Sequence, residues 1–391
     1  MVTNIIGIFL ILIKKFKKNY CKQGAGTMIF LAQWEKDKHM TWSGTTLSLM
    51  KSLRRRTNLK VPEIESLKFF HKLFFFFLNL VLRKKYIKNI NFNIFFLRYQ
   101  ENNIIHDIQN TNDNILQIGD LIDNRNSSIY QDLSISALLF IKEYDTKAFN
   151  YSGFQNLPIE GIRERNSLQK TRYENAKFIF TMSKWLRDFL VLNEGYSKKK
   201  VIYVGAGTNI STNKICPNKK NKKRILFVGK DFQRKGGDLV IESFKHLRHN
   251  YLSDAELYII GPKDIGELKN VSGVHFIGPL SPENLSEYFN LCDIFCMPSR
   301  FEAYGIVFAE ALCYGLPCIA RNKFEMKNII HDGKNGLLIE DDNIEKLSEK
   351  MYRLLNDRSI YKNVHDNRNI YLNEYSWDKV AKRIVNKLIR N

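Results

Sequence analysis

The second half of the chain alternates short apolar runs with longer stretches of helical periodicity. An apolar run bounded by turn-forming residues is typical of a strand buried on both faces, as in a parallel sheet. Parallel strands need a crossover between them, and the longer stretches supply it as helices. The expected strands lie at 225–229, 255–261, 274–278, 293–297, 317–320 and 336–340. The pattern therefore predicts an α/β unit in which helices cover a parallel sheet.

The first half of the chain begins in the same way. A strand is expected within 27–34, a loop at 36–44 and a helix at 45–56, which is the βα opening of a Rossmann-like half. Further strands are expected at 114–119, 128–132, 176–183 and 201–207. We therefore expect a second sheet of the same kind.

The length of the chain and its composition suggest how it divides. At 391 residues, the prior of about 150 residues per domain favours two domains. One segment, 209–223, is rich in Asn, Lys and Ser, which is a linker composition. The predicted division is a basic apolar extension at 1–26, a first Rossmann-like domain at 27–208, the linker at 209–223, a second Rossmann-like domain at 224–375 and a last helix at 376–391.

Two carboxylates lie close together in sequence across an expected strand-to-helix turn. Glu302 follows the apolar run at 293–297, and Glu310 lies in an apolar stretch that begins near Gly305 and is typical of a buried helix. A buried carboxylate is costly unless it is hydrogen-bonded or neutralised. Two such groups beside free helix N–H groups can hold the hydroxyls and phosphates of a sugar nucleotide. The alternative is a helix glutamate that pairs with a nearby Lys or Arg.

A pair of cations precedes another expected helix. Arg234 and Lys235 come directly before a helix that opens near Gly236. The positive end of a helix dipole disfavours each cation by about 0.3–1 kcal/mol. A bound anion such as a diphosphate reverses that penalty. The alternative is a solvated basic turn.

The charge of the chain is strongly positive. It has 61 Lys and Arg against 40 Asp and Glu, a formal net charge of +21. This charge favours anionic partners, which include nucleotide phosphates, acidic lipids and nucleic acid. Because the basic residues are scattered and no zinc-finger or RNA-binding signature is present, nucleic acid is not the expected partner.

Two segments are candidates for membrane contact. Residues 4–13 are apolar, with lysines following at 14–18, but the run is too short to span a bilayer and its charge order is the reverse of a signal peptide. Residues 69–82 are rich in Phe and lie between the basic triplets 54–56 and 83–85. Such a segment can lie in the interface of an anionic membrane. The alternatives are an over-long start for the first segment and a core helix for the second.

The six cysteines have no paired zinc-like spacing, and four of them lie in apolar runs. They are expected to be reduced core thiols rather than a disulfide framework. Reduced thiols favour a cytoplasmic location. Association with the cytoplasmic face of a membrane would agree with the basic charge.

The stretch Ser299–Glu310 resembles the two-glutamate signature of the family-4 retaining glycosyltransferases, which are also called glycosyl transferases group 1. Residues 224–237 resemble the phosphate-binding turn of that family, and 332–338 and 375–377 resemble further family elements. The resemblance covers about residues 27 to 391. It implies the GT-B architecture, in which two Rossmann-like domains face each other and a C-terminal helix crosses back to the first domain.

The resemblance also implies an activity, the transfer of a sugar from a nucleotide diphosphate sugar to an acceptor hydroxyl with retention of configuration. Arg234 and Lys235 would then stabilise charge on the leaving diphosphate. Gly229 belongs to the phosphate-binding turn, while Gly305 and Ile306 would donate backbone N–H groups to the donor. These residues form the predicted donor side of the site.

The remaining site residues are assigned through the same resemblance. Glu302 would hold sugar hydroxyls near the reacting carbon, and Glu310 would hold the ribose diol. Asp132, at a strand end, resembles the position where relatives carry His or Asp beside the reacting sugar. Gly44 resembles a glycine of the loop that faces the donor phosphate or the acceptor. The alternatives are a polar strand end for Asp132 and a plain turn with a helix N-cap around Gly44.

No metal and no cofactor are expected, because no Asp-x-Asp pair follows a strand and the cations can neutralise the diphosphate. The expected partners are a nucleotide sugar, a glycan or lipid-linked acceptor and an anionic membrane surface. The expected setting is the synthesis of glycans, lipopolysaccharide or cell-envelope polysaccharide. The alternatives are another GT-B enzyme, such as a nucleotide-sugar epimerase or a phosphorylase, and a non-catalytic basic protein that binds membranes or nucleic acid.

Overall fold

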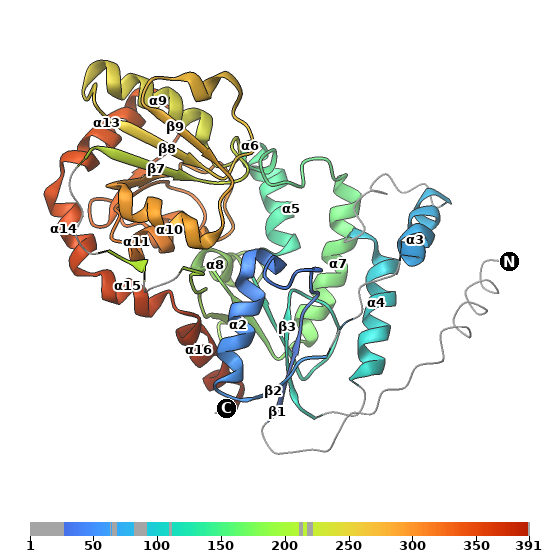
Figure 1. The fold of residues 1–391 in the computed structure, drawn as a ribbon. Coiled ribbons are helices and arrows are strands. Elements are labelled where there is room, and N and C mark those ends of the chain that lie inside the picture. The colour runs from blue at the N-terminus through green and yellow to red at the C-terminus, as the bar shows by residue number, and fades with distance from the viewer. Residues whose placement is uncertain are drawn as a thin grey trace.

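The protein folds into two α/β halves, each built on a parallel sheet of six strands (Figure 1). The computed structural model describes residues 27–62, 64, 69–81, 92–108, 112–210, 214–216 and 222–389. The first sheet belongs to the blue and green half of the chain, and the second belongs to the yellow, orange and red half. The expected fold class, with two Rossmann-like domains, is confirmed.

The first sheet has the strand order β2-β1-β3-β4-β5-β6, and all of its neighbouring strands are parallel. Its strands are β1 (Thr27–Leu31), β2 (Asn58–Lys60), β3 (Asn114–Ile118), β4 (Ser127–Gln131), β5 (Phe178–Thr181) and β6 (Val201–Tyr203). β1 is buried along its whole length, which explains its unbroken apolar run.

Helices flank the first sheet on both faces. They are α2 (Thr45–Arg54), α3 (Phe69–Val81), α4 (Ile94–Asp107), α5 (Ile135–Tyr144), α6 (Thr146–Phe149), α7 (Ile159–Asn175) and α8 (Lys184–Leu192), with a short turn η1 (Thr41–Gly44) before α2. A serine caps the start of α8, because the Ser183 side chain accepts a hydrogen bond from the N–H of Leu186 at 3.1 Å.

The second sheet has the order β12-β11-β10-β7-β8-β9 and is also parallel throughout. Its strands are β7 (Arg224–Val228), β8 (Glu256–Ile260), β9 (Val274–Gly278), β10 (Ile294–Cys296), β11 (Cys318–Arg321) and β12 (Gly336–Ile339). All six strands expected from the apolar runs are therefore present. The order reverses between β7 and β10, and ligands of open parallel sheets bind outside the carboxyl ends of the strands at such a point.

The helices of the second half alternate with these strands. They are α9 (Gly237–Asn250), the short turn η4 (Gly266–Asn270), α10 (Pro282–Leu291), α11 (Ile306–Cys313), α12 (Met326–Ile329), α13 (Ile344–Asn356), α14 (Arg358–Asp366), α15 (Arg368–Glu374) and α16 (Trp377–Ile389). The last of them, α16, returns to the first domain and packs against α2 (Figure 1). The expected crossover helix is confirmed.

Side-chain contacts join the two halves near α6 and α8. Glu325 accepts a hydrogen bond from the Trp185 N–H at 2.9 Å, at the amino end of α8. The Trp185 ring lies edge-on to Phe324, with 5.2 Å between the ring centroids. Lys323 and Asp145 form an ion pair with an N to O distance of 2.7 Å. These contacts hold the carboxyl edges of the two sheets close together.

The ion pairs that join the residues just after α2 to α16 are exposed and are expected to contribute little to stability. Arg55 and Arg56 lie 2.8 and 3.9 Å from Asp378, whose side chain is 49% exposed. Replacing Asp378 with Asn should lower the free energy of unfolding by less than about 1 kcal/mol. Denaturant unfolding of the variant and the wild type measures this difference. A loss of several kcal/mol would show that these pairs, and not apolar packing, hold α16 in place.

The structure tests the predictions about the cysteines and about membrane-spanning segments. Cys292, Cys296, Cys313 and Cys318 are buried and form no disulfide, as expected for core thiols, while Cys216 is free and exposed. Cys21 and the whole extension at 1–26 lie outside the described residues. Within the described part of the chain, no helix combines the length and the apolar content needed to cross a bilayer.

Candidate active site

The loops after β7 and β10 meet at the switch point of the second sheet. The first loop carries Arg234 and Lys235, and the second carries Glu302. A backbone hydrogen bond of 2.8 Å from the Arg300 N–H to the Arg234 carbonyl joins them. The sheet order therefore brings together two segments that are far apart in sequence, at the edge where a ligand is expected.

Lys235 and Glu302 form a buried ion pair between these loops. The Lys235 ammonium donates to one Glu302 oxygen, and Arg234 Nη1 lies 3.8 Å from the same oxygen. Each member of the pair is only 9% exposed. Burial lowers the pKa of Lys235, and the neighbouring Glu302 carboxylate opposes that effect. The charge of Lys235 is therefore costly to bury and depends on a negative partner.

Arg234 is the more accessible of the two cations. Its side chain is 25% exposed, with its Nε 3.0 Å from Asp231 and its Nη1 3.2 Å from the Phe301 carbonyl. The sequence predicts that cations before this helix need an anion. The structure shows that carboxylates of the protein itself supply part of that compensation.

Gly229 at the end of β7 leaves room for the Lys235 side chain. A Cβ atom at Gly229 would lie 2.7 Å from Lys235 Cγ, which is closer than side chains approach each other. The absence of a side chain therefore lets Lys235 run back across the turn toward Glu302. Any larger residue at position 229 of the predicted phosphate-binding turn would collide with the Lys235 side chain.

The amino end of α11 faces the same loops. Gly305 precedes the helix in a left-handed conformation, with φ of 88°, which a glycine adopts without strain. The first N–H groups of a helix have no partner within the helix, so those around Ile306 are suited to an anion or a hydroxyl group. The predicted donors at Gly305 and Ile306 therefore lie at a helix start.

Glu310 is buried on α11 and has a neutral partner. It is 7% exposed, and its Oε1 accepts a hydrogen bond from the Asn209 N–H at 3.2 Å. Burial raises the pKa of Glu310 to about 7. Among the described residues, no Lys or Arg forms an ion pair with Glu310. The alternative interpretation, a helix glutamate paired with a nearby cation, therefore does not apply to Glu310.

Asp132 approaches this group from the first domain. It follows β4 directly and lies half-buried in front of α5. Burial and the nearby Glu302 raise the pKa of Asp132 to about 6, while a hydrogen bond from the Trp42 side chain opposes the rise. Glu302 belongs to the second domain and Asp132 to the first, and the two carboxylates are close enough for the charge of Glu302 to act on Asp132.

The loop that holds Trp42 has an unusual backbone. Trp42, Ser43 and Gly44 all adopt left-handed conformations, with φ of 48°, 56° and 84°. Two consecutive non-glycine residues in this region are strained, and such strain is found where a functional loop is held by its surroundings. The Trp42 ring packs edge-on against Tyr130, with 6.0 Å between the ring centroids. The strained loop thus directs the Trp42 indole to Asp132.

Asn209 links this loop to the second domain. Its side chain donates to the Ser43 carbonyl at 2.9 Å and accepts from the Ser48 hydroxyl at 2.9 Å and from the Trp377 indole at 3.0 Å. Its backbone N–H holds Glu310. Sequence reasoning assigned this residue only to the linker, since a single Asn in a polar segment carries no signal of such contacts.

Replacing Trp42 with Phe is expected to change the pH dependence of activity. The indole hydrogen bond lowers the pKa of Asp132, so its loss should raise that pKa further above its usual range. The acidic limb of the rate profile should then move to higher pH, with a several-fold loss of rate near pH 6. Trp34→Phe is the matched control, because Trp34 packs against Phe30 instead. Unchanged profiles for both variants would contradict the role of Trp42.

A partly buried network of charges supports the loop that carries Glu302. Arg300 makes two hydrogen bonds of 2.7 and 2.9 Å to Asp238 on α9 and one of 3.1 Å to Asp342. Arg321 donates to the other oxygen of Asp342. The network ties the loop before Glu302 to the helix after Lys235. Sequence reasoning did not single out these residues.

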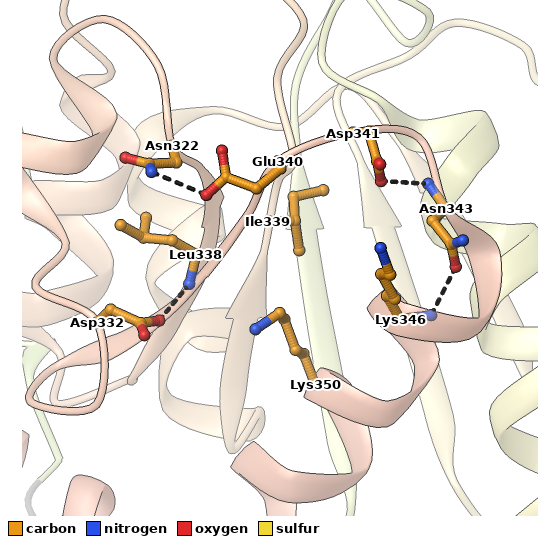
Figure 2. A pocket seen from close by; sticks show the side chains of 9 residues that line it. All are labelled: Asn322, Asp332, Leu338, Ile339, Glu340, Asp341, Asn343, Lys346 and Lys350. Carbon is orange, nitrogen blue, oxygen red and sulfur yellow. Dashed lines mark hydrogen bonds between the residues drawn. The ribbon is translucent and has the colours of Figure 1, made fainter.

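Two other features lie apart from the predicted site. His106 is exposed on α4 beside Asp107. A hollow lies along the edge strand β12 and α13, lined by Asn322, Asp332, Leu338, Ile339, Glu340, Asp341, Asn343, Lys346 and Lys350 (Figure 2). None of these residues belongs to the predicted site. Among the described residues, no cluster of three or more metal-ligating side chains is present.

Comparison with solved structures identifies the fold. WaaG, a glycosyltransferase involved in lipopolysaccharide biosynthesis, superimposes with a TM-score of 0.64 at 13% identity, over 93% of this chain and all of that chain (100%). A mutant of S. aureus TarM, solved in complex with fondaparinux, α-GlcNAc-glycerol and UDP, gives a TM-score of 0.51 at 17% identity, over 68% of this chain and 56% of that chain. The protein therefore has the GT-B fold of glycosyltransferases.

The sequence comparison is more specific for the second domain. Residues 211–369 match the family model of glycosyl transferases group 1. An uncharacterized glycosyltransferase of Methanocaldococcus jannaschii is 29% identical over 210 residues, which cover 52% of this chain and 57% of that relative. The chain spans about half the length of the curated relatives it matches. The resemblance to group 1 glycosyltransferases is confirmed.

Proposed function

We propose that the protein is a glycosyltransferase that moves a sugar from a nucleotide diphosphate sugar to an acceptor hydroxyl. The observation that carries the proposal is the buried pair of Lys235 and Glu302 in the loops before α9 and α11, with Asp132 of the first domain close enough to Glu302 for the two charges to interact. A cation, a hydroxyl-binding carboxylate and free helix N–H groups at a switch point match the parts of a sugar diphosphate.

The donor would lie across the second domain. Its diphosphate would contact Arg234 and Lys235 and the N–H groups of Gly305 and Ile306, next to the turn that contains Gly229. Charge that develops on the leaving diphosphate would be stabilised by groups already in position, which is the type of stabilisation that contributes most to such reactions. The protein would need neither a bound metal nor a cofactor for this step.

The two glutamates would orient the donor. Glu310, which has a neutral partner and a raised pKa, would accept hydrogen bonds from the ribose hydroxyls. Glu302 would hold hydroxyls of the transferred sugar while Lys235 turns toward the diphosphate. Asp132 and the Gly44 loop would contact the reacting sugar or the acceptor from the first domain. Retention of configuration is proposed from the resemblance to the family.

The acceptor is proposed to be a glycan or a lipid-linked sugar in lipopolysaccharide or cell-envelope polysaccharide synthesis. WaaG, which shares the fold, is described as acting in lipopolysaccharide biosynthesis. The buried thiols agree with a cytoplasmic location. Both points are proposals for this chain.

The experiment that tests the donor is thermal unfolding with UDP, GDP, ADP and CDP. A ligand at one hundred times its Kd should stabilise the wild type by about 2.7 kcal/mol. The Arg234→Ala/Lys235→Ala variant should lose that shift. The Lys198→Ala/Lys199→Ala variant, which removes two exposed cations just before β6 in the first domain, should keep it. If no nucleotide stabilises the wild type, the transferase proposal fails.

Product analysis separates the proposal from related GT-B activities. With the identified donor, a transferase forms a glycosidic bond to an added acceptor. An epimerase converts the donor without an acceptor, and a phosphorylase needs inorganic phosphate. Detection of the acceptor-dependent product is the expected result.

A further inference from the structure

The helix α3 shows its apolar side to solvent. Its outward side chains are Leu73, Phe74, Phe76, Phe77, Leu80 and Val81, which are between 37% and 76% exposed. At 3.6 residues per turn they cover an arc of about 160° on the helix. We call these six residues the α3 face. A surface helix of a water-soluble domain normally buries such an arc and exposes its polar side.

The contacts of α3 with the rest of the domain use a different side of the helix. Phe75 is 5% exposed and packs edge-on against Phe96 of α4, with 5.5 Å between the ring centroids, and near Tyr99 at 5.6 Å. The helix is therefore anchored by Phe75, while the α3 face keeps a large part of its surface in contact with solvent. Phe95 of α4 adds a further exposed ring, at 51%.

The sequence that contains the α3 face is basic. Between residues 66 and 100 there are seven Lys or Arg residues and no Asp or Glu. Arg98, one turn after Phe95 on α4, is exposed. Apolar rings on a helix within a basic segment suit an anionic bilayer, in which acyl chains lie beneath negatively charged headgroups.

We propose that the α3 face docks on a membrane surface that contains anionic phospholipid, with the rings of α3 in the headgroup and acyl boundary. A second copy of the chain fits the face less well, because it would bring fourteen cations together without an anion in the same segments. The apolar run at 4–13 is also a poor occupant, because the first 34 residues contain lysines and no acidic residue. An anionic surface is the occupant with the complementary charge.

The position of α3 is compatible with catalysis at the membrane. α3 lies on the flank of the first domain that is remote from the second domain (Figure 1). A membrane bound there would leave the second domain and the loops after β7 and β10 free. This docking surface does not depend on the proposed transferase activity, because binding to lipid can be measured without substrate.

The test is flotation of the full chain with vesicles of phosphatidylcholine alone and with added phosphatidylglycerol. The wild type should float with the anionic vesicles and not with the neutral ones, and high salt should weaken the binding. The Phe76→Ser/Phe77→Ser variant should bind at least about tenfold more weakly. The matched control is Tyr144→Ser/Leu192→Ser, which removes two exposed apolar side chains elsewhere in the first domain and should bind as the wild type does.

Three outcomes would overturn the proposal. The first is equal flotation of the wild type with neutral and anionic vesicles, or none with either. The second is equal binding by the α3 face variant and the control. The third is a change in self-association of the α3 face variant, measured by light scattering, without a change in lipid binding, which would assign the face to a second copy. Unfolding temperatures of both variants report whether they are folded.

Discussion

Replacing Lys235 with Met is expected to lower the rate of sugar transfer by about 10²–10³-fold, because the variant loses a cation aimed at charge that develops on the diphosphate. Met keeps the length and the apolar stem of the side chain, so the turn around Gly229 should remain filled. Initial rates at saturating donor measure the effect. A rate within a few-fold of the wild type would remove Lys235 from the proposed mechanism.

The same substitution should also destabilise the protein, and a second variant separates the two effects. Without Lys235, buried Glu302 keeps only Arg234 at 3.8 Å, and removing one partner of a buried ion pair costs about 3–5 kcal/mol. The Lys235→Met/Glu302→Gln double variant removes both charges and should recover most of that stability. It should remain inactive. Recovery of stability without recovery of activity assigns the loss of rate to chemistry and not to unfolding.

Replacing Glu310 with Gln is expected to stabilise the free protein at alkaline pH while weakening nucleotide binding. The pKa of Glu310 is about 7 in the folded protein against 4.5 for an ordinary Glu, so the folded state favours the protonated form. Ionised Glu310 therefore lowers the free energy of unfolding. This loss of stability is nearly absent below pH 4.5, grows as the pH rises to 7 and is complete well above pH 7. The variant should therefore gain up to about 3 kcal/mol at pH 8 and almost nothing at pH 4.5.

The cost of that substitution should appear in the nucleotide affinity. A hydrogen bond to a charged group contributes about 1.5–3 kcal/mol, so the Kd of the nucleotide should rise by about ten- to one-hundredfold. Glu325→Gln is the control, because Glu325 is also buried with a raised pKa but caps α8 at the domain contact. It should leave the affinity unchanged. Equal Kd values for Glu310→Gln and the wild type would contradict the ribose assignment.

Much of the second domain could be predicted from short-range patterns. Its strands are buried in a parallel sheet, so each one appears as an apolar run between turn formers, and all six were expected near their observed places. The start of α11 after Gly305 follows from the same kind of local signal. The predicted site loops follow the central strands β7 and β10, although their assignment as a site rested on the resemblance to a family.

The helix α7 shows why other elements were not predicted. Its buried side includes Arg165, Gln169 and Arg172, which contact Asp120 in the loop after β3. A helix that buries polar groups lacks the apolar periodicity by which amphipathic helices are recognised. Those groups can be buried only because Asp120 and Glu101 are brought to them by the fold.

By itself, the sequence determined the alternation of strands and helices, the cations before α9 and the two glutamates around the start of α11, because these features depend on neighbours along the chain. Only the tertiary structure decided that Lys235 pairs with Glu302, that Trp42 donates to Asp132 and that Asn209 joins Glu310 to the first domain. Each of these contacts joins segments that are far apart in the sequence, and the third also depends on how the two domains meet. Their geometry follows from the sheet order and the return of α16, which no local pattern contains.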